Sequence, residues 1–215
     1  MNQIENFNLH HILNKLSNQR PIFYSEADFK HALAWFIQNL YKNAKIRLEV
    51  PFSKSKQSRY LDLLVKLNRN SIPIEIKYKT RELSVNLEDE SYNLKGQGAQ
   101  DLGRYDFFKD IQRIEHWIKN NNKCYGWIVF LTNDSAYWKA PGRPNVSYKN
   151  FRMEDGRKVS GTLTWNKNAG SGTTKNREDP IHLKNQYPLN WKDYSSFNKP
   201  GYSVFKYLAI NVINR

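Results

Sequence analysis

The segment from Arg59 to Thr80 constrains the fold more than any other part of the chain. Apolar residues take every second position on both sides of a polar turn at residues 68–71. These alternating residues are Leu61, Leu63, Val65 and Leu67 before the turn, and Ile72, Ile74 and Ile76 after it. A period of two is typical of a β-strand with one buried face. The segment is therefore predicted to form a β-hairpin.

The register of this hairpin follows from its apolar rows, because a slip by one residue would turn a whole face toward water. The predicted pairs are Leu67 with Ile72, Val65 with Ile74, and Leu63 with Ile76. On the opposite face, the same register sets Asp62 across from Lys77 and Leu64 across from Glu75. Two carboxylates and a lysine are thus expected to converge on one face.

The segments around the hairpin alternate between helical and strand patterns. A helix is predicted over 26–41, where Ser25 followed by Asp28 is typical of a helix N-terminus. A strand over 45–52 precedes the hairpin strands at 59–67 and 72–78, and a helix over 101–120 follows them. The nearly continuous apolar run at 124–131 indicates a strand buried on both faces. Residues 53–58 are expected to form a hairpin loop and residues 81–100 a long polar loop.

Three parts are predicted along the chain. Residues 1–20 form an N-terminal helical segment, residues 21–132 form the core, and residues 133–215 form a basic extension packed on it. The extension is expected to be mainly strand and loop, with strands at 158–165 and 202–213 and a loop at 166–180. The predicted fold class is α/β, with a central mixed sheet flanked by helices.

Charge points to an anionic partner. The net charge is +14, and residues 111–215 carry 17 basic and seven acidic residues, against 17 and 13 in residues 1–110. Nucleic acid is the first partner that such a balance indicates, although a generally basic proteome would produce the same charge. Cys124 is the only cysteine, which excludes an internal disulfide and favours a reduced, cytoplasmic compartment. No apolar run is long enough to cross a bilayer, so no membrane association is expected.

The carboxylates of the hairpin have a specific chemical use. Asp62 and Glu75 would supply the hard oxygen ligands that Mg²⁺ prefers, and Lys77 would orient a water or stabilise charge on a phosphate. Glu26 shares the apolar stripe of its helix, so it either favours the helix dipole or serves the site. The alternative for Asp62 and Lys77 is an ordinary surface ion pair.

The order of these elements, with Glu26 on the first helix, Asp62 on a strand and Glu75-Ile76-Lys77 on the next, resembles the PD-(D/E)XK nuclease superfamily. The core of that superfamily runs α-β-β-β-α-β, and the resemblance covers residues 21–132. It implies a restriction-endonuclease-like fold and a Mg²⁺- or Mn²⁺-dependent nuclease that cuts DNA in preference to RNA. Two features depart from the superfamily pattern. Leu61 stands where the motif has proline, and the Gln-x-x-x-Tyr element of the exonuclease-like branch is not matched, because Gln100 and Tyr105 are five residues apart.

The resemblance also assigns roles to individual residues. It makes Asp62 the central metal ligand and Glu75 the second one, with the backbone carbonyl of Ile76 completing the shell. Lys77 matches the lysine of the motif, and Glu26 matches the helical glutamate of many members.

Four further residues are candidates for contact with nucleic acid: Lys79, Arg81, Gln100 and Arg104. Lys79 and Arg81 extend the second hairpin strand and could reach phosphates, or could simply form a solvated strand end. Gln100 and Arg104 begin the second helix and could face the cleft, or be ordinary helix-start residues. The chain is thus predicted to be a metal-dependent nuclease, with a catalytically inactive nucleic-acid-binding protein of the same fold as the alternative. A homodimer would suit the cutting of both strands of a duplex.

Overall fold

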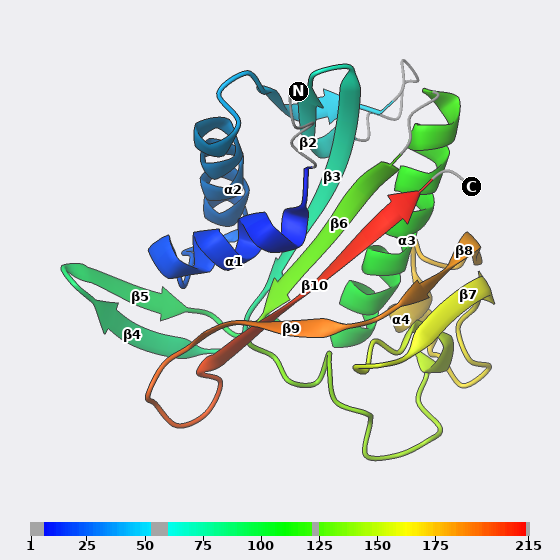
Figure 1. The fold of residues 1–215 in the computed structure, drawn as a ribbon. Coiled ribbons are helices and arrows are strands. Elements are labelled where there is room, and N and C mark those ends of the chain that lie inside the picture. The colour runs from blue at the N-terminus through cyan, green and yellow to red at the C-terminus, as the bar shows by residue number, and fades with distance from the viewer. Residues whose placement is uncertain (1–6, 53–59, 122–124, 214–215) are drawn as a thin grey trace.

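A six-stranded mixed sheet with the strand order β1-β2-β3-β6-β10-β9 forms the centre of the molecule (Figure 1). The structure is a computed structural model, and it describes residues 7–52, 60–121 and 125–213. Strands β3 and β6 are parallel, whereas all other neighbours in this sheet are antiparallel. The strands are β1 (Lys45–Pro51), β2 (Tyr60–Leu67), β3 (Asn70–Lys79), β6 (Tyr125–Thr132), β9 (Trp191–Ser196) and β10 (Val204–Ile213).

Helices cover both faces of the sheet. Helices α1 (Leu9–Gln19) and α2 (Glu26–Leu40) lie on one face, and the long helix α3 (Gln100–Asn120) lies on the other (Figure 1). The remaining elements are β4 (Leu83–Leu87), β5 (Glu90–Leu94), η1 (Lys149–Phe151), β7 (Lys158–Leu163), α4 (Ser171–Thr174) and β8 (Ile181–Pro188). The α/β class and the mixed central sheet that the sequence predicts are therefore confirmed.

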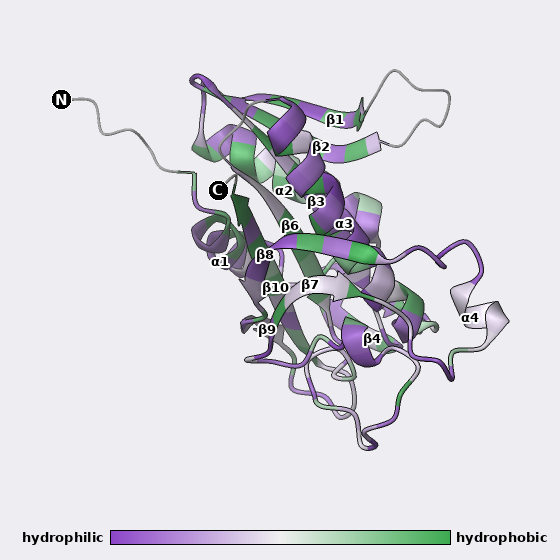
Figure 2. Ribbon diagram, turned by 90° about the vertical axis from the view of Figure 1, so that its right-hand side faces the viewer, coloured by the Kyte–Doolittle hydropathy of each residue, from purple (hydrophilic) through white to green (hydrophobic). Residues whose placement is uncertain are grey.

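Two hydrophobic cores hold these layers together. One lies between the sheet and helices α1 and α2, and the other lies between the sheet, α3 and the β7–β8 hairpin. Strand β6 contributes to both cores, because seven of its eight residues are buried. The apolar character of β6 and β10 between the helices is visible in Figure 2. The prediction of a strand buried on both faces is confirmed over Tyr125–Thr132.

The local signals around the first core helix are also confirmed. Helix α2 begins after Ser25, whose hydroxyl accepts a hydrogen bond from the Asp28 N–H at 3.1 Å. This interaction satisfies one of the amide groups that a helix leaves free at its N-terminus.

The predicted hairpin register is wrong by two residues. Leu63 pairs with Ile74, Val65 with Ile72, and Leu67 with Asn70. The cause is a tighter turn: only residues 68 and 69 lie outside the strands, and Asn68 adopts a φ of 55°, which asparagine tolerates better than most residues. A shift by two residues keeps every side chain on its predicted face. Continued by one pair, the observed register sets Asp62 across from Glu75 and not from Lys77.

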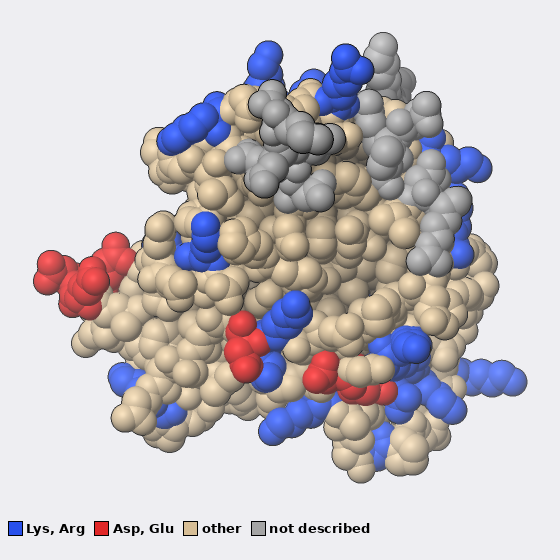
Figure 3. Space-filling model, viewed as in Figure 1, with Lys and Arg blue, Asp and Glu red and all other residues tan. Residues whose placement is uncertain are grey.

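The prediction of a long loop over 81–100 is also wrong, because residues 83–94 contain two strands. Strands β4 and β5 form a separate antiparallel hairpin, with Leu83, Val85, Tyr92 and Leu94 buried in the core. Its turn contains Glu88 at a φ of 51°. The alternation was present in the sequence, but the surrounding polar residues masked it. The acidic tip of this hairpin, formed by Glu88, Asp89 and Glu90, projects from the edge of the molecule in Figure 3.

The C-terminal part of the chain completes the central sheet. Strands β9 and β10 lie beyond the predicted boundary at residue 132, yet β10 pairs directly with β6 from Lys206 to Ile213. The sheet is therefore continuous across that boundary. Of the residues beyond 132, those in β7, β8 and α4 form the smaller part that packs against α3. The loop predicted at 53–58 and Cys124 lie outside the described residues. In the part of the chain that the structure describes, no helix is long and apolar enough to cross a membrane.

A tight contact in the core can be tested at Gly126. A Cβ atom added there would lie 2.7 Å from Ile114 Cγ2, 2.7 Å from Pro73 Cγ and 3.0 Å from the Pro73 carbonyl oxygen. We expect Gly126→Ala to lower the free energy of unfolding by about 1–3 kcal/mol, because overpacking forces the sheet and α3 apart. Urea denaturation would measure this change. The control is Gly98→Ala, since a Cβ there meets nothing within 4 Å; an equal effect of both substitutions would contradict this packing.

Candidate functional site

The candidate site lies where β2 and β3 separate. Their backbone pairing ends at Leu63 and Ile74, although β3 continues to Lys79. Beyond that point, carboxylates occupy the free edge of β3. Asp62 Oδ2 accepts a hydrogen bond from the Ile76 N–H at 2.9 Å, and Glu26 Oε2 accepts one from the Tyr78 N–H at 2.9 Å. Two predicted site residues thus satisfy backbone amides that a neighbouring strand would otherwise pair.

Lysine 30 holds Asp62 from the side of helix α2. Its Nζ lies 3.0 Å from Asp62 Oδ1 and also forms an ion pair with Glu49 of β1. Lys30 stands four residues after Glu26, so both side chains project from one face of the helix. Helix α2 therefore delivers one acidic and one basic group to the separation between β2 and β3.

Helix α3 supplies the charges on the other face of the sheet. Arg113 forms ion pairs with Glu75 and with Asp110, the latter at 3.0 Å between Nη1 and Oδ1. Lys77 Nζ lies 2.8 Å from Asp110 Oδ2. We call the resulting group the charged cluster, and it consists of Glu26, Lys30, Asp62, Glu75, Lys77, Asp110 and Arg113.

The pKa values of the two central carboxyl groups of the cluster, Asp62 and Glu75, are shifted in opposite directions. Burial raises the pKa of Glu75, the charges of Asp110 and Asp62 raise it further, and Arg113 offsets only part of this increase. Burial also acts to raise the pKa of Asp62, but hydrogen bonds from Glu75 and the Ile76 N–H, together with the charge of Lys77, lower it below its usual value. Of the two carboxyl groups, Glu75 therefore holds a proton more readily than Asp62.

Lysine 77 stays charged in this surrounding. Burial acts to lower the pKa of Lys77, but the charge of Asp110 and the hydrogen bond to it outweigh burial, so the pKa is raised above its usual value. A lysine that keeps its proton so firmly acts as a cation and a hydrogen-bond donor. It does not act as a general base near neutral pH.

The donor set suits a hard divalent cation. Two carboxyl groups in hydrogen-bonding contact need a proton or a cation between them, because two adjacent negative charges repel strongly. The Ile76 carbonyl oxygen lies 3.4 Å from Lys77 Nζ, and the N–H of the same residue donates to Asp62. Over residues 7–52, 60–121 and 125–213, however, no group of three or more His, Cys, Asp or Glu side chains is arranged to hold a metal ion. Asp62, Glu75 and the Ile76 carbonyl would therefore hold an ion that keeps several waters, as Mg²⁺ does.

The structure brings together the predicted residues Glu26, Asp62, Glu75, Ile76 and Lys77. The other predicted residues lie toward the carboxyl ends of β3 and β6. Lys79 pairs with Thr132 in the sheet, and the Arg81 guanidinium lies 4.9 Å from the centre of the Tyr202 ring.

The two predicted residues on helix α3 have different surroundings. Gln100 Nε2 donates a hydrogen bond to Asp134 Oδ2 at 3.0 Å. Arg104 is only 3% exposed, and its guanidinium lies between the rings of Tyr137 and Tyr148. The position of Arg104 therefore gives its guanidinium no direct access to a phosphate on the surface.

Sequence reasoning missed Lys30, Asp110 and Arg113. A signal existed for Asp110, because it lies three residues after Phe107 and four before Ile114, on the apolar stripe of α3. An acidic residue on a buried face requires a partner, which is the argument that singled out Glu26. Lys30 and Arg113 then follow as helical neighbours of Glu26 and Asp110.

Comparisons with known proteins identify no relative: no family model, no curated protein and no solved structure matches this chain.

The raised pKa of Glu75 predicts a pH dependence of stability. Above pH 4.5, the ordinary pKa of this group, the unfolded chain loses the proton while the folded protein keeps it. The stability of the wild type should then fall as the pH rises toward the folded-state pKa. Glu75→Gln removes this loss, so the variant should gain stability relative to the wild type as the pH rises from 4.5 toward the folded-state pKa. Urea unfolding in EDTA would measure the difference.

The matched control is Glu88→Gln, at the exposed tip of the β4–β5 hairpin, which should follow the wild type at every pH. A difference between Glu75→Gln and the wild type that stays constant over this range would contradict the assignment of the proton to Glu75.

Proposed function

We propose that this protein is a metal-dependent nuclease of the PD-(D/E)XK type that hydrolyses phosphodiester bonds, in DNA in preference to RNA. The observation that carries the proposal is the meeting of Asp62 and Glu75, with Lys77 beside them, at the free edge of β3. The chain order α2, β1, β2, β3, α3 and β6 supports it, because it agrees with the α-β-β-β-α-β order that the resemblance implies, with the β4–β5 hairpin as an insertion.

The ion would be Mg²⁺ or Mn²⁺, held by Asp62, Glu75 and the Ile76 carbonyl oxygen. Such an ion lowers the pKa of a bound water and neutralises charge on the scissile phosphate. The chain itself prepares the ligands: the Ile76 N–H and Lys30 orient the Asp62 carboxylate through both of its oxygens. Arg113 orients Glu75 in the same way from helix α3.

Lys77 would stabilise the negative charge that develops on the phosphate during hydrolysis. Its raised pKa supports this role, since a preorganised cation in a partly buried site acts more strongly than one in water. Glu26 positions β3 through the Tyr78 N–H and adds negative charge near Lys77. Its role here is to position the strand and the lysine.

Nucleic acid as the partner is supported by the net charge of +14 and by the cations at the carboxyl end of β3. Lys79 and Arg81 continue the strand that carries Glu75 and Lys77, so a phosphate backbone bound at the cluster would extend toward them. The cytoplasm as the compartment and a homodimer as the assembly stay predictions from the sequence.

One observation favours a second candidate, a nucleic-acid-binding protein of the same fold without catalysis. Asp62 forms an ion pair with Lys30, Asp110 forms ion pairs with Lys77 and Arg113, and Arg113 also contacts Glu75. Protein cations thus neutralise the carboxylates that a metal would use, and a metal must compete with them.

A cleavage assay separates the two candidates. Supercoiled plasmid, single-stranded DNA and structured RNA would be incubated with the protein in Mg²⁺, Mn²⁺ or EDTA. We expect metal-dependent cleavage that falls at least about 100-fold in Asp62→Asn and in Lys77→Gln, because each loses a group that acts on the phosphate or its metal. Asp89→Asn, on the exposed β4–β5 turn, should cut like the wild type. Tight nucleic-acid binding without cleavage in any metal would support the inactive binding protein.

Salt dependence tests the role of the basic strand end. A protein that loses one phosphate contact should show a slope of log K against log salt that is less steep by about one. We expect this change for Lys79→Gln and for Arg81→Gln, measured by fluorescence anisotropy with duplex DNA. Lys66→Gln, at the opposite end of the same hairpin, is the control. Unchanged slopes in both variants would place the nucleic acid elsewhere on the surface.

A further inference from the structure

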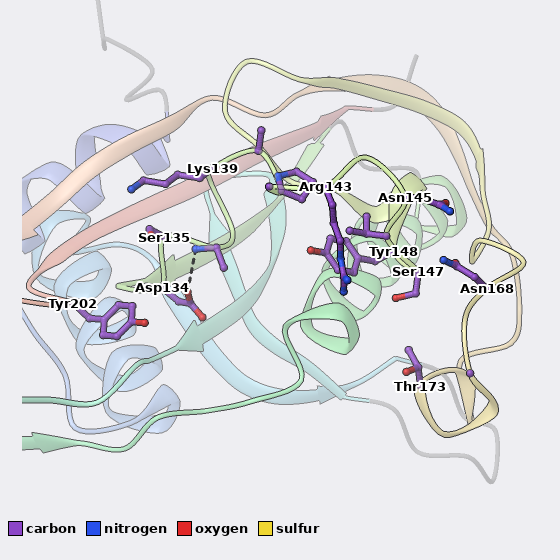
Figure 4. A pocket seen from close by; sticks show the side chains of 16 residues that line it. Asp134, Ser135, Lys139, Arg143, Asn145, Ser147, Tyr148, Asn168, Thr173 and Tyr202 are labelled. Carbon is purple, nitrogen blue, oxygen red and sulfur yellow. Dashed lines mark hydrogen bonds between the residues drawn. The ribbon is translucent and has the colours of Figure 1, made fainter.

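A polar pocket lies beyond the carboxyl ends of β3 and β6, apart from the charged cluster. It has a volume of about 690 Å³ and is formed mainly by the segment from Asp134 to Tyr148, with Asn168, Thr173 and Tyr202 closing its sides. Figure 4 shows Tyr202, Asp134 and Lys139 at one end, Ser147, Asn168 and Thr173 at the other, and Arg143 with Tyr148 between them. Pockets of this size accept ligands of about the size of a nucleotide.

The charge around this pocket favours an anion. Lys139 and Arg143 line it, and within the described part of the chain neither forms a salt bridge. Asp134 is the sole acidic side chain among the described lining residues, and its oxygens already accept hydrogen bonds from the Ala136 N–H and from Gln100.

A third cation lies behind the wall of the pocket. The guanidinium carbon of Arg104 lies 4.3 Å from the centre of the Tyr148 ring and 4.9 Å from that of Tyr137. Arg104 is buried and forms no salt bridge within the described residues; its Nη2 donates to the Ala136 carbonyl oxygen, and its Nε has no hydrogen-bond partner. Burial lowers the pKa of Arg104, and nearby groups that include Asp134 offset only part of this, so negative charge in the pocket would stabilise the guanidinium.

The lining also offers what a nucleobase requires. Tyr148 and Tyr202 present aromatic rings, on which bases stack without regard to sequence. Asn168 presents a side-chain amide, which can donate to and accept from the polar edge of a base, and Asn145, whose Oδ1 accepts from Asn166, adds an amide donor. Cations, rings and amides in one cavity match the three parts of a nucleotide.

The pocket is also connected to the proposed path of a strand. Lys79 lies two residues beyond Lys77 on β3, about 7 Å further along the sheet. Arg81 follows two residues later, and its guanidinium lies over the ring of Tyr202, which itself lines the pocket. Cations therefore continue from the charged cluster to the mouth of the pocket.

We propose that this pocket binds one nucleotide unit, with its phosphate at Lys139 and Arg143 and its base against Tyr148. The inference rests on the nucleic-acid partner of the proposed function but does not depend on hydrolysis. The unit could be a free nucleotide or one nucleotide of a bound strand, since both present the same base and phosphate.

Calorimetric titration in EDTA tests the proposal without involving the metal site. The probes are the four nucleoside 5′-monophosphates, adenosine and inorganic phosphate. We expect at least one monophosphate to bind about tenfold or more tightly than either adenosine or phosphate, because base and phosphate contribute together. Arg143→Gln and Tyr148→Leu should each weaken it about tenfold, whereas Arg69→Gln, on the exposed β2–β3 turn, should not.

The Asp62→Asn variant distinguishes this pocket from the charged cluster. It should bind the monophosphate as the wild type does, even though the proposed function predicts that it no longer cuts. Loss of nucleotide binding in Asp62→Asn would overturn the proposal, as would binding that Arg143→Gln leaves unchanged. Phosphate binding as tight as the monophosphate would overturn the assignment of the base to Tyr148.

A second arm compares the two sources of the nucleotide. A short single-stranded oligonucleotide competes with the labelled monophosphate for the wild type. Competition shows that the pocket takes a nucleotide of a strand, and its absence restricts the pocket to free nucleotides. The melting temperature of each variant shows whether it is folded. If Tyr148→Leu is unfolded, the test depends on Arg143→Gln, which lies at an exposed position.

Discussion

The candidate site depends on one hydrogen bond, from the Ile76 N–H to the carboxylate of Asp62. A backbone amide in the middle of a sheet normally pairs with the next strand, and leaving it without a partner would be costly. Here β2 separates from β3, and the Asp62 side chain accepts the hydrogen bond that the backbone of β2 would otherwise accept. The same replacement occurs two residues later, where Glu26 accepts from the Tyr78 N–H. The sheet thereby opens an edge that carries carboxylates, and every other charge of the cluster is arranged around this edge.

The second constraint is electrostatic. Carboxyl groups so close together must be neutralised, and the chain does this with Lys30 from α2 and with Lys77 and Arg113 on the side of α3. Each helix contributes through residues three or four positions apart, so its own geometry sets the spacing of the charges. This compensation stabilises the cluster without a metal. It leaves a proton on Glu75, and a bound cation could replace that proton.

Much of this could be predicted from the sequence. The apolar alternation of β2 and β3 and the cap at Ser25 are local signals, and they placed Asp62, Glu75, Lys77 and Glu26 near one another. The register failed by two residues because the turn depends on the conformation of Asn68, which no apolar pattern reveals. Lys30, Asp110 and Arg113 were missed because their role is set by tertiary contacts between helices and sheet. The pocket has no sequence signal, since its walls come from loops that meet only in the folded chain.

The most direct test of the central claim is a titration with Mn²⁺, followed by electron paramagnetic resonance of the free ion. Asp62 and Glu75 are the two side-chain ligands, so the account predicts one site in the wild type that is lost in both Asp62→Asn and Glu75→Gln, while Glu88→Gln keeps it. No site in the folded wild type, or a site that survives both substitutions, would contradict the assignment of the free edge of β3 as a metal centre.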